Sequence, residues 1–345
     1  METLERNEWA DVAQLVEITS DAVIICELDG TILHVNNRLL GLMCEERADV
    51  IGGDVKDVLY SSAFERATEH RLPFETDGSE NELMLKLSDG SFIPVTGNQT
   101  GVLMLDYLIG AMRRAGKLPE HPYFLKTIVT TEMARKVAEA NGVTCCDTFT
   151  GFKFMAEKKN QLESQGLGHV IMSYEESYGY MLGDYVRDKD AVTASLILTE
   201  MAAWYAVQGM TLFDALEALY RKYGFYGEKT HNLVMPGLDG LEKMAALMKS
   251  LRTDPPTHIA GVEVLRRKDY TDGSVIDCRT GEKTAMELSG SNVLRYERAD
   301  GTAILVRPSG TEPKIKVYIL TIGKDAAERD ENLAKYSQWV ATLTK

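Results

Sequence analysis

The sequence predicts a multidomain protein that combines one α/β domain with two α+β modules. Its 345 residues are more than a single compact core usually contains. Strand-like and helical runs alternate along the middle of the chain, which is typical of α/β layering. Acidic residues gather at one end, because residues 1–95 hold 20 Asp and Glu against 7 Lys and Arg while the remainder is nearly balanced. We therefore expect three modules, at residues 1–95, 96–224 and 225–345.

Composition excludes several classes of protein. The formal net charge is −14, so a nucleic-acid partner is not expected, because phosphate backbones attract basic surfaces. No apolar run reaches the roughly 18–20 residues of a membrane span, and the acidic N-terminus has no signal-peptide pattern. The five cysteines show neither disulfide nor metal spacing. We expect a cytoplasmic protein without membrane or nucleic-acid partners.

Two hairpin signals frame the acidic N-terminal segment. β-rich runs flank Asp29-Gly30 and again Asp89-Gly90, with helical stretches between them. This order, with "LDGTILHVNNRLLGLM" and "VIGGDVKDVL", resembles a PAS domain, a small α+β sensor fold. No clear final strand precedes Thr96, so the resemblance implies a truncated PAS-like module over residues 1–95. Such a module would act as a sensor or as the interface of a homodimer.

The character of the sequence changes from Thr96 onward. "GVLMLDYLIG" has apolar residues at helical spacing and predicts a helix. "KTIVTT" predicts a strand leading into a helix that ends at Asn141-Gly142, and "HVIMSYEES" predicts another strand. Further helices are expected over "KDAVTASLILTEMAAWYAVQG" and, between a cap at Thr211 and a stop at Gly224, over "TLFDALEALYRKYG". Residues 96–224 are thus predicted to form an α/β domain with a mixed sheet.

Residues 225–345 have the pattern of a smaller α+β domain. Helices are expected over "GLEKMAALMKSLR" and "AAERDENLAKYSQWVATL". The strand-like segments between them are "AGVEVLRRKDY", "NVLRYERADGTAILVRPSG" and "PKIKVYILTI".

One loop, "VRPSGTEPKIK", carries residues suited to a phosphate monoester. Arg307 offers a planar fork of hydrogen-bond donors. Ser309 and Thr311 offer hydroxyls, and Gly310 lets backbone N–H groups converge on an anion. The alternative is a tight turn with a solvent-facing arginine, and these residues alone favour neither interpretation.

Two other loops carry weaker signals. In "SYEESYGYM", Glu175 and Ser177 alternate along an extended segment, so both side chains would point the same way and hold adjacent sugar hydroxyls. A capping pair for the following turn is the simpler alternative. In "DTFTGFKFMAEK", Lys153 follows a glycine turn and either presents its ammonium to an anion or lies on a solvated helix start. Taken alone, the solvated position is favoured.

Together these loops closely resemble the α-D-phosphohexomutase family, in the bacterial phosphoglucomutase branch that includes phosphopentomutases. The resemblance runs from Thr96 to the C-terminus and covers the third and fourth domains of the family. The resemblance therefore places "TGNQTG" at the start of the module at residues 96–224. The chain as a whole resembles a fusion of a PAS-like module with the C-terminal half of a mutase. The matching segments are "TGNQTG", "TIVTTE", "TGFKF", "MSYEESYGY", "VRDKDAV", "LYRKYGFYGE" and "SNVLRYERADGTAILVRPSGTEPKIKVY".

The resemblance implies a role for each matching position in binding a phosphorylated sugar, either a hexose or a pentose. One set would hold the phosphate remote from the reacting end, and the other would hold the sugar hydroxyls and complete the pocket. The implied residues are Arg307, Ser309, Gly310, Thr311 and Lys189 for the phosphate, and Glu175, Ser177, Thr150, Gly151 and Lys153 for the sugar.

The resemblance also implies chemistry for which this sequence has no matching residues. The family transfers a phosphoryl group through a serine in a Ser-His-Asn-Pro loop and holds magnesium in an Asp-x-Asp-x-Asp-Arg loop. The sequence contains no Ser-His pair, and Asp188 and Asp190 are followed by Val192 where a third aspartate would stand. Because the transfer needs a nucleophile and a metal, we expect a binding half that is inactive alone, with no catalytic residue, metal site or cofactor in this chain. The alternative is a PAS-type sensor or dimerisation protein that uses the mutase half as a scaffold.

Overall fold

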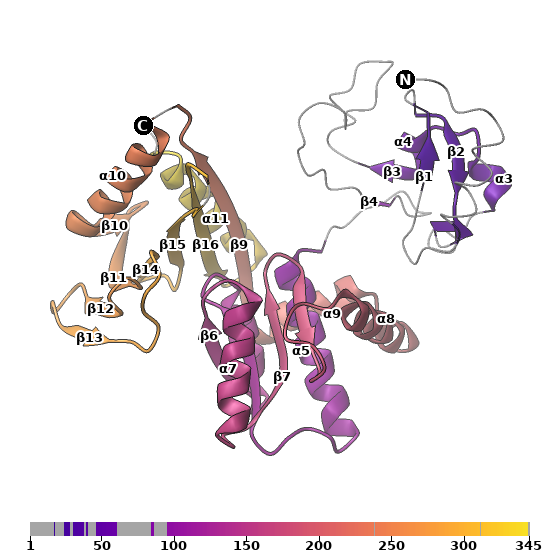
Figure 1. Ribbon diagram of the computed structural model, residues 1–345, viewed down its shortest axis with the longest axis horizontal. Coiled ribbons are helices and arrows are strands. Elements are labelled where there is room, and N and C mark those ends of the chain that lie inside the picture. Colours follow the sequence, from indigo (N-terminus) through magenta and orange to yellow (C-terminus); the bar gives the residue numbers. More distant parts are fainter. Residues whose placement is uncertain are drawn as a thin grey trace. The chain divides into compact units, whose positions relative to one another are not determined.

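The computed structural model describes residues 95–237, 239–310 and 312–343, with shorter parts of the N-terminal segment at residues 17, 24–27, 30–37, 39–40, 46–60 and 84–85. The chain forms two compact units, Met1–Pro94 and Val95–Lys345 (Figure 1). Both contain helices and strands, and the second holds two separate sheets. The predicted mixture of α/β and α+β structure is present.

The N-terminal unit contains the first predicted hairpin. Strands β1 and β2 pair antiparallel, and Gly30, which lies between them in the sequence, has a φ of 98° that favours glycine. The second hairpin, at Asp89-Gly90, lies outside the described residues, so the PAS-like assignment stays a prediction. A small apolar cluster contains Ile32, Val35, Leu39, Val50 and Val55. The elements of this unit are β1 (Ile24–Cys26), β2 (Ile32–Val35), α3 (Arg47–Val50), α4 (Val55–Val58), β3 (Leu59–Tyr60) and β4 (Met84–Leu85).

The second unit begins with a four-stranded sheet and five helices. The strand order is β6-β5-β7-β8, with β5 parallel to both neighbours and β8 antiparallel to β7. The strands are β5 (Pro122–Thr127), β6 (Thr144–Thr148), β7 (His169–Glu175) and β8 (Gly179–Leu182). The helices are α5 (Gly97–Arg114), α6 (Glu132–Ala140), α7 (Phe152–Ser164), α8 (Ala191–Val207) and α9 (Leu212–Tyr223).

Local signals explain where these helices begin and end. Thr96 and Gln99 form a capping box at the start of α5, and Thr211 and Asp214 form another at the start of α9. The chain leaves α9 at Gly224, which has a φ of 115°. The helix predicted over "GVLMLDYLIG", the cap at Thr211 and the stop at Gly224 are therefore confirmed.

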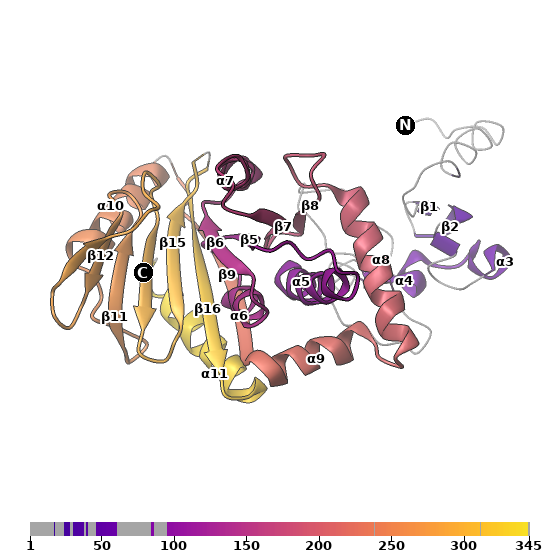
Figure 2. The same cartoon turned by 90° about the horizontal axis from the view of Figure 1, so that it is seen from below.

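The helices cover both faces of the four-stranded sheet. Adjacent residues of a strand point to opposite faces. Accordingly, Phe124 packs in a cluster with residues of α5, α6 and α9, whereas Leu125 packs with residues of α7. Figure 2 shows α7 on one side of the strands and α5 and α6 on the other. This is a three-layered α/β/α arrangement.

The C-terminal part of the second unit is an antiparallel sheet with two helices. The strand order is β13-β12-β11-β14-β15-β16-β9, and β10 pairs with β11. Strand β9 pairs with β16 along its whole length, from Phe225 opposite Gly323 to Val234 opposite Lys314. The strands are β9 (Phe225–Val234), β10 (His258–Ile259), β11 (Val262–Asp269), β12 (Ser274–Asp277), β13 (Lys283–Ala285), β14 (Leu294–Arg298), β15 (Ala303–Pro308) and β16 (Lys314–Gly323), and the helices are α10 (Gly240–Thr253) and α11 (Ala326–Val340).

The two faces of this sheet pack against different partners. Alternate residues of β16, including Ile315 and Val317, join the core formed with α10 and α11. The other face carries Tyr318, which clusters with Ile128 and Val129 from the turn after β5. The sheet therefore contacts the α/β/α domain through the face that holds Tyr318.

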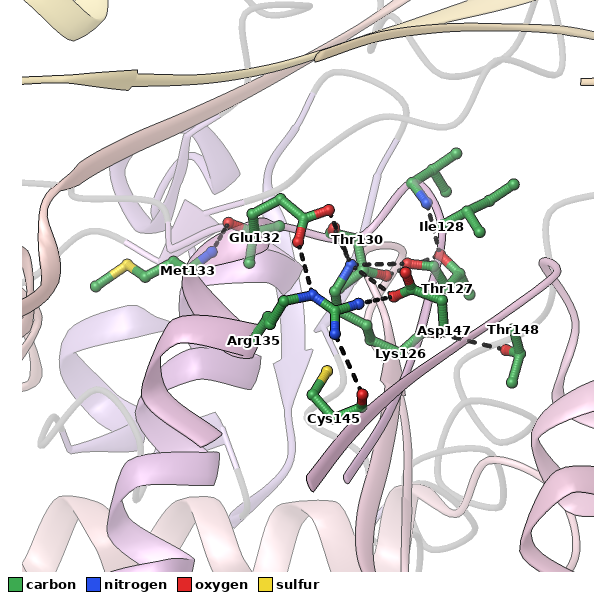
Figure 3. A network of polar contacts seen from close by, with 12 residues as sticks. Lys126, Thr127, Ile128, Thr130, Glu132, Met133, Arg135, Cys145, Asp147 and Thr148 are labelled. Carbon is green, nitrogen blue, oxygen red and sulfur yellow. Dashed lines mark hydrogen bonds and ion pairs between the residues drawn. The ribbon is translucent and has the colours of Figure 1, made fainter. Parts of the chain in front are cut away.

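A network of charged side chains around the buried Lys126 joins the same two domains, and Figure 3 shows its part in the α/β/α domain. The fully buried Lys126 ammonium lies 3.1 Å from Asp147 Oδ1 and 3.4 Å from Glu132 Oε1. Arg135 contacts both carboxylates, and Arg295 of β14 donates to Glu132 Oε1 at 3.1 Å. Burial lowers the pKa of Lys126, but Asp147 and Glu132 outweigh it and keep the pKa raised. The network stays charged and spans the contact between the domains.

Candidate functional site

The hairpin of β15 and β16 places three basic side chains on one face. Arg307 lies directly opposite Lys316, and Lys314 precedes Lys316 by two positions on the same strand. Opposed residues share a face of an antiparallel pair, as do residues two apart on one strand. All three remain partly exposed. Like charges directly opposite each other destabilise a strand pair, and an anion bound at this face would offset that repulsion.

These side chains line an open cavity of about 510 Å³ at the tip of the hairpin. Ser309 N donates to Lys314 O at 2.8 Å, and Glu312 N donates to Ser309 Oγ at 3.3 Å, which closes the turn. Three of the predicted phosphate residues thus share one cavity, whereas Thr311 lies outside the described residues. The lining residues are Arg307, Pro308, Ser309, Gly310, Glu312, Lys314 and Lys316.

The predicted sugar residues lie around the end of β7. Glu175 is the last residue of β7, and its Oε1 accepts from Gly151 N at 2.5 Å. The expectation for Ser177 is wrong in one respect, because the extended segment stops at Glu175. Tyr178 has a φ of 64°, and the chain reverses so that Gly179 pairs with Glu175. Ser177 is therefore exposed in a turn and does not share a strand face with Glu175.

Two predicted basic residues lie near the start of α7. Lys153 is exposed on the first turn of that helix. Lys189 Nζ lies 5.7 Å from the centre of the Phe152 ring, so its charge is close to the same helix start. Thr150 and Gly151 immediately precede the helix, and Thr150 is half-buried. The structure thus brings Gly151 into contact with Glu175 and places Lys189 beside α7.

Tyr318 interacts electrostatically with both groups of candidate residues. It is buried on the strand face that also holds Lys316. Burial raises the pKa of Tyr318, and the Glu176 carboxylate and, less strongly, Glu175 add to the rise. The charge of Arg307 and a hydrogen bond with its side chain oppose it. Charges act strongly only over short distances in a screened medium. The charge of Arg307 and the carboxylates at and after the end of β7 therefore act on the same buried hydroxyl.

Sequence reasoning missed several residues of this region. Lys314 and Lys316 had a readable signal, because the alternation in "PKIK" places both on one face of a strand. Glu176 had none. Its Oε2 accepts from the hydroxyls of Thr127 and Thr130, both at 3.4 Å, and these residues follow a strand far earlier in the chain.

One group of possible metal ligands in the described part of the chain is already paired with a lysine. Its members are Glu163, His169 and Asp184, whose possible ligand atoms lie close together. Lys159 Nζ lies 2.5 Å from Glu163 Oε1 and 2.8 Å from Asp184 Oδ1. The ammonium pairs with both carboxylates and would repel a divalent cation. No metal role is assigned to this group.

An α/β/α domain followed by an antiparallel sheet with a basic hairpin defines the class of this unit, and comparison with known families identifies it. The family model "Phosphoglucomutase/phosphomannomutase, alpha/beta/alpha domain III" matches residues 96–223. The model of the C-terminal domain of the same family matches residues 232–331. Through these two domains, the chain belongs to the phosphoglucomutase/phosphomannomutase family.

Curated relatives agree with this assignment. Phosphoglucomutase of Staphylococcus aureus strain bovine RF122 / ET3-1 is 34% identical over 316 residues, which cover 86% of this chain and 56% of that protein. The protein of strain USA300 is 33% identical over the same shares. The chain therefore spans little more than half the length of these relatives. The alignments are longer than residues 96–345, so they extend into the segment before Thr96.

A solved structure shows a similar fold. The exocytosis-sensitive phosphoprotein pp63/parafusin, a phosphoglucomutase from Paramecium crystallised in an open form, superimposes with a TM-score of 0.51 at 17% identity. The superposition covers 76% of this chain and 42% of that chain.

In the part of the chain that the structure describes, no helix combines the length and hydrophobicity needed to cross a bilayer.

Proposed function

We propose that this chain binds a phosphorylated sugar and forms the sugar-phosphate-binding half of a phosphoglucomutase-type enzyme. The observation that carries the proposal is the basic face of the β15–β16 hairpin, where Arg307, Lys314 and Lys316 line one cavity. A phosphate would accept two parallel hydrogen bonds from the Arg307 guanidinium, and the lysines would balance its charge. Ser309 and Gly310 lie at the same cavity and would complete the contacts.

The sugar would extend from this phosphate toward the end of β7. Glu175 and Gly151 are joined by a hydrogen bond, so the strand end and the start of α7 lie side by side. A carboxylate is a strong acceptor for sugar hydroxyls. Lys153 and Lys189 add positive charge beside this edge, which suits a ligand that carries a phosphate. Whether the sugar is a hexose or a pentose depends on contacts at this end.

Arg307→Lys is expected to raise the dissociation constant for glucose 1-phosphate about tenfold, because a lysine ammonium cannot make the paired hydrogen bonds of the guanidinium. Isothermal titration calorimetry measures the change. Arg279→Lys is the matched control, since Arg279 pairs with Glu263 on the surface and does not line the cavity. Equal affinities for the Arg307→Lys variant and the unchanged protein would refute the role of Arg307.

The purified chain is expected to bind glucose 1-phosphate without converting it to glucose 6-phosphate. No Ser-His pair is present in its 345 residues to supply the phosphoryl-carrying serine of the family, and the group Glu163, His169 and Asp184 is already paired with Lys159. A coupled assay with added magnesium tests this expectation. Turnover that depends on magnesium would show that the chain holds a complete active site and would contradict the proposed half-enzyme.

A further inference from the structure

Glu312 is the single carboxylate among the described residues that line the basic cavity. It forms an ion pair with the Lys314 ammonium. The hydrogen bond and charge of Lys314, with a smaller effect of Lys316, hold the pKa of Glu312 below its usual range. Glu312 is therefore ionised at neutral pH, and its carboxylate pairs with one of the cations that line the cavity.

We propose that the Glu312 carboxylate competes with phosphate for the Lys314 ammonium. Glu312 releases Lys314 when a phosphate enters the cavity. This inference rests on the proposed binding of a sugar phosphate. A carboxylate and a phosphate both seek the same ammonium hydrogens, and two anions close together repel each other. Glu312 thus weakens phosphate binding and keeps the bound ligand releasable.

The contacts of Glu312 allow this exchange at little cost to the fold. Its backbone N–H donates to Ser309 Oγ and its carbonyl accepts from Lys314 N, so the backbone of the turn is held independently of the side chain. The side chain is 57% exposed. It can turn into solvent while the hairpin keeps its shape, and a solvated carboxylate loses little when an exposed ion pair opens.

The same ion pair explains how the hairpin tolerates its basic residues. Arg307 and Lys316 lie directly opposite each other, and Lys314 adds a third positive charge. Like charges at these positions destabilise the strand pair. The negative charge of Glu312 offsets part of this repulsion, and an arriving phosphate takes over that role.

Glu312→Gln is expected to tighten the binding of inorganic phosphate about fivefold at low ionic strength, because the amide keeps the size of the side chain and removes its charge. The gain should shrink in high salt, since exposed charges are screened. Isothermal titration calorimetry on the full chain measures both values. In a Lys314→Gln background, the same Glu312→Gln change should have a much smaller effect, because its partner is gone.

Glu287→Gln is the matched control. Glu287 is also an exposed glutamate that pairs with a lysine, Lys158, at 2.6 Å, but it does not line the basic cavity. We expect less than a twofold change for Glu287→Gln. An unchanged or weaker affinity of Glu312→Gln, with phosphate still bound by the unchanged protein, would overturn the inference and leave the proposed function intact. If neither protein took up phosphate, the proposed function itself would be contradicted.

Discussion

Replacing Gly97 or Gly101 with alanine is expected to lower the free energy of unfolding by about 2–3 kcal/mol. Both glycines lie in the first turns of α5, where the β7–β8 hairpin packs against the helix. A Cβ at Gly97 would lie 2.1 Å from the carbonyl oxygen of Glu176, and one at Gly101 would lie 2.4 Å from ring atoms of the buried Tyr174. Either contact forces backbone or a packed ring to move.

A third glycine of the same helix gives a control with the opposite sign. A Cβ at Gly110 would meet only the end of the Arg114 side chain, at 3.1 Å, and that side chain can shift. Gly110→Ala is expected to raise the free energy of unfolding by about 0.5–1 kcal/mol, since alanine favours the helix. Urea denaturation measures all three variants. If Gly101→Ala were as stable as Gly110→Ala, the close packing of α5 on the hairpin would be wrong.

Arg295→Met is expected to lower the free energy of unfolding by about 3 kcal/mol, because it removes a buried guanidinium from the half-buried Glu132 carboxylate. Arg295 donates to Glu132 Oε1 at 3.1 Å and to Ile128 O at 3.3 Å, across the contact between the two domains. Methionine keeps the apolar stem of the side chain. Lys126 and Arg135 still face Glu132, so the expected loss lies at the low end for a broken buried pair.

The matched control for this variant is Arg279→Met. Arg279 is 60% exposed and pairs with Glu263 on the surface, so its loss should cost less than about 1 kcal/mol. The two variants are compared by urea denaturation at pH 7. Equal losses would mean that the contact between the domains does not depend on the buried network.

The pH dependence of stability gives a second measurement on the same network. Burial alone would raise the pKa of Glu132, but Lys126, Arg295 and Arg135 outweigh it and hold the pKa well below its usual range. A carboxyl with a lowered pKa stabilises the fold fully above its unfolded pKa, and this stability is lost as the pH falls toward the folded pKa. The difference in the free energy of unfolding between the unchanged protein and Arg295→Met should therefore shrink as the pH falls below about 4.5.

Much of the secondary structure followed from local signals in the sequence. The cap at Thr211, the stop at Gly224 and the helix that contains Leu105 depend on neighbouring residues, and the structure confirms them. The buried network was not predictable in this way. Lys126 and Arg295 are far apart in sequence, and only the packing of the two domains brings them to the same carboxylate, Glu132.

The candidate site was predictable only in part. The loop around Arg307 carries its chemistry in consecutive residues, so its residue types alone indicated an anion. The position of Ser177 was predicted wrongly, because the strand gives way to a turn after Glu175 and the positive φ of Tyr178 is set by pairing with β8. Periodicity describes a strand well but does not show where it ends.

The most direct test of the account is a crystal structure of the chain soaked with glucose 6-phosphate. We expect the phosphate to lie against the Arg307 guanidinium in the basic cavity, near Ser309, with the sugar directed toward Glu175. A sugar phosphate bound elsewhere, or a basic cavity that stays without ligand at saturating concentration, would contradict the account.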